Sequence, residues 1–128
     1  MQLIYEAIIP IEPRTKKNSQ EIFYRIDPKT RKKKPFIMPS LKYRQYVHDA
    51  LYFLRPLNID FPVNIKCLFY MQTRRRVDLT NLLEAIDDVM VAKGTIKDDN
   101  FTIIEGHDGS RVLYDKEIPR TEIYIYKL

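Results

Sequence analysis

Acidic side chains gather in one stretch of the chain, directly after a run of arginines. The run is Arg74–Arg76, and Asp78 follows it after a single residue. Asp88 lies ten residues farther along, and the pair Asp98-Asp99 begins ten residues beyond that. Carboxylate oxygens are the ligands that Mg²⁺ prefers, and arginine binds phosphate through paired hydrogen bonds. The combination predicts a cation site that handles phosphate.

The acidic residues are expected to lie on a helix and on the turn that follows it. Apolar residues recur every three or four positions, at Leu79, Leu82, Leu83, Ile86, Val89 and Met90, which is one face of an amphipathic helix. We expect the helix to end at Lys93-Gly94, because glycine adopts the left-handed conformation that closes many helices. Asp98-Asp99 would then lie where the chain can turn back.

Each of these carboxylates also has a purely structural explanation. Asp78 suits an N-cap, whose oxygens accept hydrogen bonds from the first free N–H groups of a helix. Asp87 and Asp88 suit a solvated helix face, and residues 98–100 suit a turn. The gathering of like charges favours the metal site, because a bound divalent ion offsets their repulsion.

Charge is distributed unevenly along the 128 residues, whose formal net charge is +5. Residues 1–77 contain 16 Lys and Arg against 6 Asp and Glu, whereas residues 78–128 contain 6 against 11. The basic part suits phosphates and the acidic part suits cations. This pattern favours a metal-dependent enzyme acting on nucleic acid over a simple nucleic-acid binder.

Two further basic segments are expected to contact a nucleic-acid backbone. Lys16 and Lys17 lie in a polar loop after the first expected strand, where they are candidates for a phosphate clamp. Lys32 and Lys33 belong to the basic tip of an expected hairpin. A solvated loop and a strand edge protected by lysines are the alternatives. The charge density of the tip exceeds what edge protection requires, which favours contact with DNA.

The chain as a whole is expected to fold as a single small α+β domain, residues 1–128. Its apolar patterns predict a mixed β-sheet with two packed α-helices. The helices are expected between Ser40 and Pro56 and from Asp78 onward. Strands are expected at residues 2–9, 21–27, 33–38, 63–71, 101–105 and 121–127, with 111–114 as a further candidate. The nearly all-apolar strand 63–71 is typical of a central strand covered on both faces.

The remaining reactive residue types give weaker signals. The single cysteine, Cys67, excludes an intramolecular disulfide and a cysteine zinc cluster, and we expect it in the core. His48 is expected at the surface, and His107 lies in a glycine-rich segment that we interpret as a loop. No apolar run reaches the ~20 residues of a membrane span, and no signal peptide is recognisable, so we expect a cytoplasmic protein.

The ordered set Asp78-Leu79-x-Asn81-Leu82, Asp88, Gly94 and Asp98-Asp99 resembles the signature of RusA-type Holliday-junction resolvases. These are small endonucleases, often encoded by prophages, that act as homodimers with Mg²⁺ or Mn²⁺. The match is strongest over residues 74–101. The resemblance implies a homodimer that nicks four-way DNA junctions by phosphodiester hydrolysis, in DNA recombination and repair.

The resemblance also implies roles for individual carboxylates. Asp78 matches the first family carboxylate and Asp99 the last, and both are catalytic and bind metal in the family. Asp98 adjoins Asp99 and is expected to share its roles. Asp88 matches a recurrent helix aspartate and is expected as a further metal ligand.

The chain departs from the family pattern at two positions. Thr80 stands where many relatives have an aspartate, and Glu84 stands where many have a lysine. These departures keep a second interpretation open, a protein that binds branched nucleic acid with weak or no cleavage. A third interpretation is an interaction scaffold, in which the carboxylates serve only helix caps and turns.

Overall fold

Strand β4, Val63–Met71, is the centre of the sheet in the computed structural model, which describes residues 1–16 and 20–128. On one edge, β4 pairs antiparallel with β7, Arg120–Lys127, and β7 pairs antiparallel with β1, Gln2–Ile9. On its other edge, β4 pairs in parallel with two short strands, β5, Ile104–Gly106, and β6, Arg111–Tyr114. The sheet is therefore mixed, as predicted.

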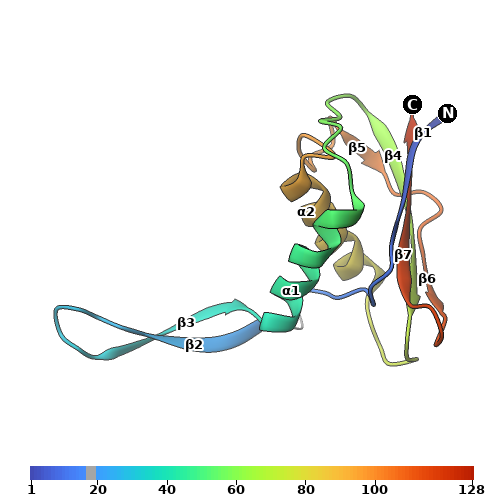
Figure 1. Cartoon of the computed structure of the whole chain (residues 1–128). Coiled ribbons are helices and arrows are strands. Elements are labelled where there is room, and N and C mark those ends of the chain that lie inside the picture. The colour runs from blue at the N-terminus through green and yellow to red at the C-terminus, as the bar shows by residue number, and fades with distance from the viewer. Residues whose placement is uncertain (17–19) are drawn as a thin grey trace.

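Two helices lie on one face of this sheet (Figure 1). Helix α1 spans Leu41–Ala50 and continues into a 3₁₀ turn, η1, at Leu51–Phe53, while α2 spans Leu79–Lys93. The fold class is α+β, a small single domain with a mixed sheet and two helices. Within the part of the chain that the structure describes, no helix is both long and apolar enough to cross a membrane.

The predicted helix boundaries are confirmed at two places. The Ser40 hydroxyl accepts a hydrogen bond from the backbone N–H of Tyr43 at 3.1 Å, which caps α1. Gly94 closes α2 with φ of 80°, a left-handed conformation that costs a residue with a Cβ roughly 1–2 kcal/mol. Both signals are local, so a few neighbouring residues suffice to produce them.

The two faces of β4 are closed in different ways. The residues at odd-numbered positions, Val63 to Met71, are buried in the core that the strand shares with the helices. On the opposite face, the Lys66 ammonium lies 4.7 Å from the centre of the Tyr124 ring, and the Arg120 guanidinium lies 3.8 Å from that of Tyr70. The prediction that other elements cover β4 on both faces is thus corrected, because cationic side chains stacked on tyrosines close the second face.

The strand predicted at residues 101–105 begins later than expected. Phe101 lies in a turn and is exposed, and β5 starts only at Ile104. The Asn100 side chain holds the turn, because its Oδ1 accepts a hydrogen bond from the Thr102 N–H at 3.0 Å. Side-chain capping of a turn therefore outweighs the β-propensity of this segment.

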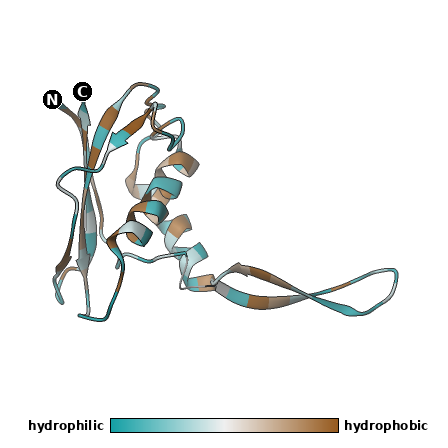
Figure 2. Cartoon of the chain, turned by 180° about the vertical axis from the view of Figure 1, so that it is seen from behind, coloured by the Kyte–Doolittle hydropathy of each residue, from teal (hydrophilic) through white to brown (hydrophobic). Residues whose placement is uncertain are grey.

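The antiparallel hairpin of β2, Gln20–Ile26, and β3, Lys33–Pro39, forms a separate two-stranded sheet. It projects away from the body formed by the main sheet and the helices (Figures 1 and 2). Its second strand leads directly into α1 through Ser40. We call residues 20–39 the arm.

Truncation of Phe69 should test the assigned core. Phe69 has no exposed surface, so Phe69→Ala should lower the free energy of unfolding by about 3–5 kcal/mol through the cavity it leaves. Phe101 is 83% exposed, and Phe101→Ala should stay within about 0.5 kcal/mol of the parent. Urea unfolding followed by circular dichroism measures both changes. Equal losses for the two variants would contradict this core.

Candidate nucleic-acid and cation site

A hollow of about 480 Å³ lies where the segment after β4 meets the loop after β1 and the start of α1. Four cationic residues line it, Arg14, Lys42, Arg75 and Arg76, together with one acidic residue, Glu21. The cations come from three separate segments of the chain. Arginine and lysine side chains converging on one hollow create a surface suited to phosphate. We call it the cationic hollow.

The structure adds two cations that sequence reasoning had not selected as binding residues. Arg14 lies in the basic loop after β1, so the composition of that loop was its only signal. Lys42 lies in the first turn of α1, and nothing in its neighbourhood in the sequence distinguishes it. Both reach the cationic hollow only because the fold brings β1, α1 and β4 together.

The three predicted arginines have different surroundings. Arg75 and Arg76 line the cationic hollow and also a second hollow of about 330 Å³. Arg75 is held by Glu12, with 3.4 Å between Nη2 and Oε1. Arg74 lines only the second of these two hollows, where its guanidinium lies 4.2 Å from the centre of the Tyr114 ring. Arg75 and Arg76 are therefore the arginines best placed to bind a phosphate in the cationic hollow.

Asp78 lies two residues after Arg76, at the N-cap position of α2. Its side chain is exposed, and it accepts no hydrogen bond from the N–H groups of the first helical turn, which the structure describes in full. Its contact is with Asn81, whose Nδ2 donates to Asp78 Oδ2 at 3.3 Å. The capping explanation for this carboxylate is therefore not supported. Its oxygens are available to a cation or a water molecule.

Asp87, Asp88 and Asp99 form a second acidic group. Burial raises the pKa of Asp88, Lys16 opposes the rise, and the charge of Asp99 adds to it. Burial also raises the pKa of Asp87, His107 opposes that rise, and the charges of Asp99 and Asp88 add to it. The chain after α2 thus brings Asp99 within electrostatic reach of both helix carboxylates.

The Asp98 side chain stabilises the turn in which Asp98 lies. Its Oδ1 accepts a hydrogen bond from the Asp99 N–H at 2.7 Å, and its Oδ2 accepts one from Asn100 Nδ2 at 3.1 Å. The Asp99 N–H and the Asn100 amide hold the pKa of Asp98 below its usual range. The predicted turn at residues 98–100 is therefore present.

Helix α2 separates Asp78 from the second acidic group. Asp88 lies ten positions after Asp78, which corresponds to about 15 Å along the helix axis. A single ion in one subunit cannot contact both carboxylates. Among residues 1–16 and 20–128, no three His, Cys, Asp or Glu side chains are arranged to hold a metal. The four aspartates selected from the sequence thus occupy two places in one subunit.

The lysines predicted to bind DNA are also spread over the surface. Lys16 shares a hollow of about 340 Å³ with Asp88, whose carboxylate it partly neutralises. Lys17 lies outside the described residues. Lys32 and Lys33 are exposed at the end of the arm, and neither lines the cationic hollow. Among the predicted lysines that the structure describes, Lys16, Lys32 and Lys33 do not line the cationic hollow.

His107 forms a hydrogen-bonded pair with Asp87 that the sequence interpretation did not anticipate. Its Nε2 lies 2.9 Å from Asp87 Oδ2, and its Nδ1 lies 2.8 Å from the Ile65 carbonyl oxygen. Only 21% of the His107 side chain and 13% of the Asp87 side chain are exposed. Burial lowers the pKa of His107, but the hydrogen bond and charge of Asp87, with the Ile65 carbonyl, outweigh burial and raise it. The two residues are 20 positions apart, so only the fold could reveal the pair.

Removal of the Asp87 charge should lower the pKa of His107. In the native protein, the raised pKa contributes stability that is complete below 6.5, the ordinary histidine value, and is lost as pH rises through the folded value. In Asp87→Asn, the free energy of unfolding should fall less than in the native protein as pH rises from 6.5 through the folded pKa of His107. Titration of the imidazole proton resonances measures the pKa, and His48→Ala identifies which resonance belongs to His107. An unchanged His107 pKa in Asp87→Asn would refute the assigned pair.

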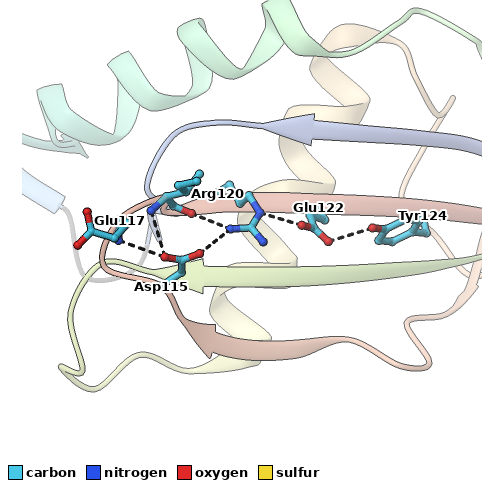
Figure 3. Close-up of polar contacts among 6 residues, drawn as sticks. Asp115, Glu117, Arg120, Glu122 and Tyr124 are labelled. Carbon is cyan, nitrogen blue, oxygen red and sulfur yellow. Dashed lines mark hydrogen bonds and ion pairs between the residues drawn. The ribbon is translucent and has the colours of Figure 1, made fainter.

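Arg120 shows how an arginine is used when it serves structure. Its guanidinium donates to Glu122 Oε2 at 2.7 Å and to Asp115 Oδ2 at 2.9 Å (Figure 3). The Tyr124 hydroxyl donates to the other Glu122 oxygen at 2.9 Å. These contacts close the turn between β6 and β7 and occupy the guanidinium with carboxylates. Arg76, which lines the cationic hollow, appears in no such network among the described residues.

Comparisons with known proteins returned no match, either to a protein-family model or to a curated protein.

Proposed function

We propose that the protein is a metal-dependent endonuclease that cleaves branched DNA, with the four-way junction as its substrate. The observation that carries this proposal is the position of Asp78 beside the cationic hollow. Arg75 and Arg76 line the hollow, and α2 begins with Asp78 at its N-cap two residues later. A phosphodiester held by these arginines would lie close to an exposed carboxylate. Metal-assisted hydrolysis needs those two partners near each other.

The donor set fits Mg²⁺, with Mn²⁺ as an alternative. Mg²⁺ is commonly held by one or two carboxylates together with substrate phosphates and water. Asp78 would supply a carboxylate and the bound phosphodiester would supply phosphate oxygens. When bound, the ion would activate water and offset the negative charge of the transition state. Arg75 and Arg76 would orient the phosphodiester and neutralise part of its charge.

A homodimer is the proposed working form. A four-way junction offers two equivalent strands, and a two-fold dimer would present two equivalent sites. Because α2 keeps Asp78 about 15 Å from Asp88 within one subunit, a shared ion would need the second acidic group of the partner subunit. The proposed catalytic and metal-binding roles of Asp98 and Asp99 depend on such a dimer.

A protein that binds branched DNA without cleaving it is the second candidate. Thr80 and Glu84 favour this function, because a hydroxyl and a carboxylate stand where the resembled family has a carboxylate and an ammonium. The separation of the described carboxylates into two places in one subunit favours it as well. The cationic hollow would serve binding equally in both cases.

Incubation with a labelled synthetic four-way junction distinguishes the two functions. The endonuclease should release nicked strands with Mg²⁺ or Mn²⁺ and none with EDTA, and a linear duplex of the same sequence should be cut much less. A binding protein should retard the junction in a native gel under all three conditions without nicking it. Retardation without nicks in either metal would overturn the proposed enzyme and leave the binding function.

A further inference from the structure

The arm carries a row of apolar side chains that its own fold leaves uncovered. Ile22, Tyr24, Ile26 and Ile37 are between 63% and 68% exposed. Alternate residues of a strand share a face, and Ile22 pairs directly with Ile37, so these four side chains form one stripe along the stem of the arm. We call it the apolar stripe. An isolated two-stranded hairpin is marginally stable in water, and such a stripe requires a partner.

The opposite face of the arm is occupied by its own contacts. Phe23 and Phe36 pack against each other with ring centres 6.0 Å apart. The Arg25 guanidinium lies 4.7 Å from the centre of the Phe36 ring, and Arg44 of α1 lies 5.4 Å from that of Phe23. Arg44 therefore ties the base of the arm to α1. The arm presents the apolar stripe on the face that these contacts leave free.

The end of the arm is strongly basic and locally ordered. Residues 20–39 contain six Lys and Arg against two Asp and Glu. Asp27 organises the turn, because its Oδ1 accepts the Lys29 N–H at 2.9 Å and its Oδ2 pairs with Lys34 at 3.1 Å. Among the described residues, the other cations of the tip have no carboxylate within 4.0 Å; they are Lys29, Arg31, Lys32 and Lys33.

We propose that the arm is a DNA-binding β-ribbon, which lies in the major groove of a duplex branch with its apolar stripe toward the bases and its basic tip on the phosphates. This inference builds on the proposed function, since it takes branched DNA as the partner. The major groove admits a two-stranded ribbon, and thymine methyl groups there offer apolar contacts. Seven residues per strand give the ribbon a reach of about 24 Å from the body.

Charge favours DNA over a second copy of the chain as the occupant of the stripe. Two arms packed stripe to stripe in the same direction would bring two basic tips together, and like charges would oppose that arrangement. DNA can instead neutralise the basic tip with its phosphates and cover the apolar stripe with its bases. Other DNA-binding proteins also place β-strands in a groove of the duplex, and apolar contacts to thymine methyl groups are available in the major groove.

Photocrosslinking from the stripe tests the occupant directly. The photoreactive amino acid p-benzoylphenylalanine replaces Tyr24, which is 66% exposed, and in a control protein it replaces Tyr52, which is 76% exposed on η1. Each protein is irradiated with a labelled junction in EDTA, so that no cleavage occurs. We expect a protein–DNA adduct from position 24 and little or none from position 52. Adducts only between two protein chains would show that a second copy covers the stripe and would overturn the proposal.

Neutralisation of the tip provides an independent measurement. Replacing Lys29, Arg31, Lys32 and Lys33 with Gln should weaken junction binding and lower the salt slope by up to about 3.6, at about 0.9 for each phosphate that is no longer neutralised. The Asp27 turn and the strand pairing are left in place. An unchanged slope, with no position-24 adduct, would overturn the arm proposal even if the junction is still nicked with Mg²⁺. Absence of nicking by the parent protein, with the adduct present, would instead overturn the enzyme and leave the arm assignment standing.

Discussion

Asp78→Asn should abolish junction cleavage while leaving the fold and junction binding intact. The substitution removes one negative charge from the proposed cation site, and we expect turnover with Mg²⁺ to fall by at least about 100-fold. Asn is as good an N-cap residue as Asp, and the Asp78 side chain makes no capping bond in this structure. The free energy of unfolding should therefore change by less than about 0.5 kcal/mol.

The measurements are single-turnover cleavage, junction affinity in EDTA and urea unfolding of the same preparation. Asp60→Asn is the matched control, because it removes an exposed carboxylate on the connector before β4. Junction affinity of Asp78→Asn should be unchanged or slightly tighter, since an anion near DNA has been removed. Cleavage at the parental rate, in protein free of contaminating nuclease, would remove Asp78 from the mechanism. Marked loss of stability would make Asp78 a structural residue.

Replacing Arg75 and Arg76 together with Ala should have the opposite effect. Both arginines line the cationic hollow, so their removal should weaken junction binding at every DNA sequence. The slope of log affinity against log salt should drop by roughly one to two units, at about 0.9 for each phosphate that the arginines would have neutralised. Cleavage should fall because less of the junction is bound by the protein, and it should recover in part at high protein concentration.

The control for this pair is a double variant with the same change of charge elsewhere on the surface. Arg55 and Lys116 are exposed and lie outside the cationic hollow, so replacing both with Ala should change the salt slope by less than about one unit. If the two double variants lose the same affinity, the effect is one of overall charge, and the hollow is not a specific phosphate site. Binding titrations over a range of salt concentrations distinguish these cases.

Features that depend on neighbouring residues were predictable from the sequence. The 3.6-residue spacing of apolar side chains predicted α2, and Gly94 predicted its end because glycine tolerates a positive φ. Ser40 predicted the start of α1 through a cap that spans three residues. The central position of β4 was predicted from its apolar composition. For the two helices, the deciding interactions span only a few positions of the chain.

The tertiary structure decided which of the charged residues share a site. Arg14 and Lys42 join Arg75 and Arg76 because three distant segments meet at the end of β4, and no local pattern specifies that meeting. The same packing of helix and sheet places His107 on Asp87.

Helix geometry also decided what sequence spacing left ambiguous. Asp78 and Asp88 are close in the sequence, yet a rigid helix with a rise of about 1.5 Å per residue holds them on different parts of the subunit. The hairpin was predicted from its turn and strands, but only the whole fold shows that it stands apart from the body as an arm (Figure 2). The exposure of its apolar stripe follows from that position. Exposure depends on what the rest of the chain covers, and that is a property of the whole fold.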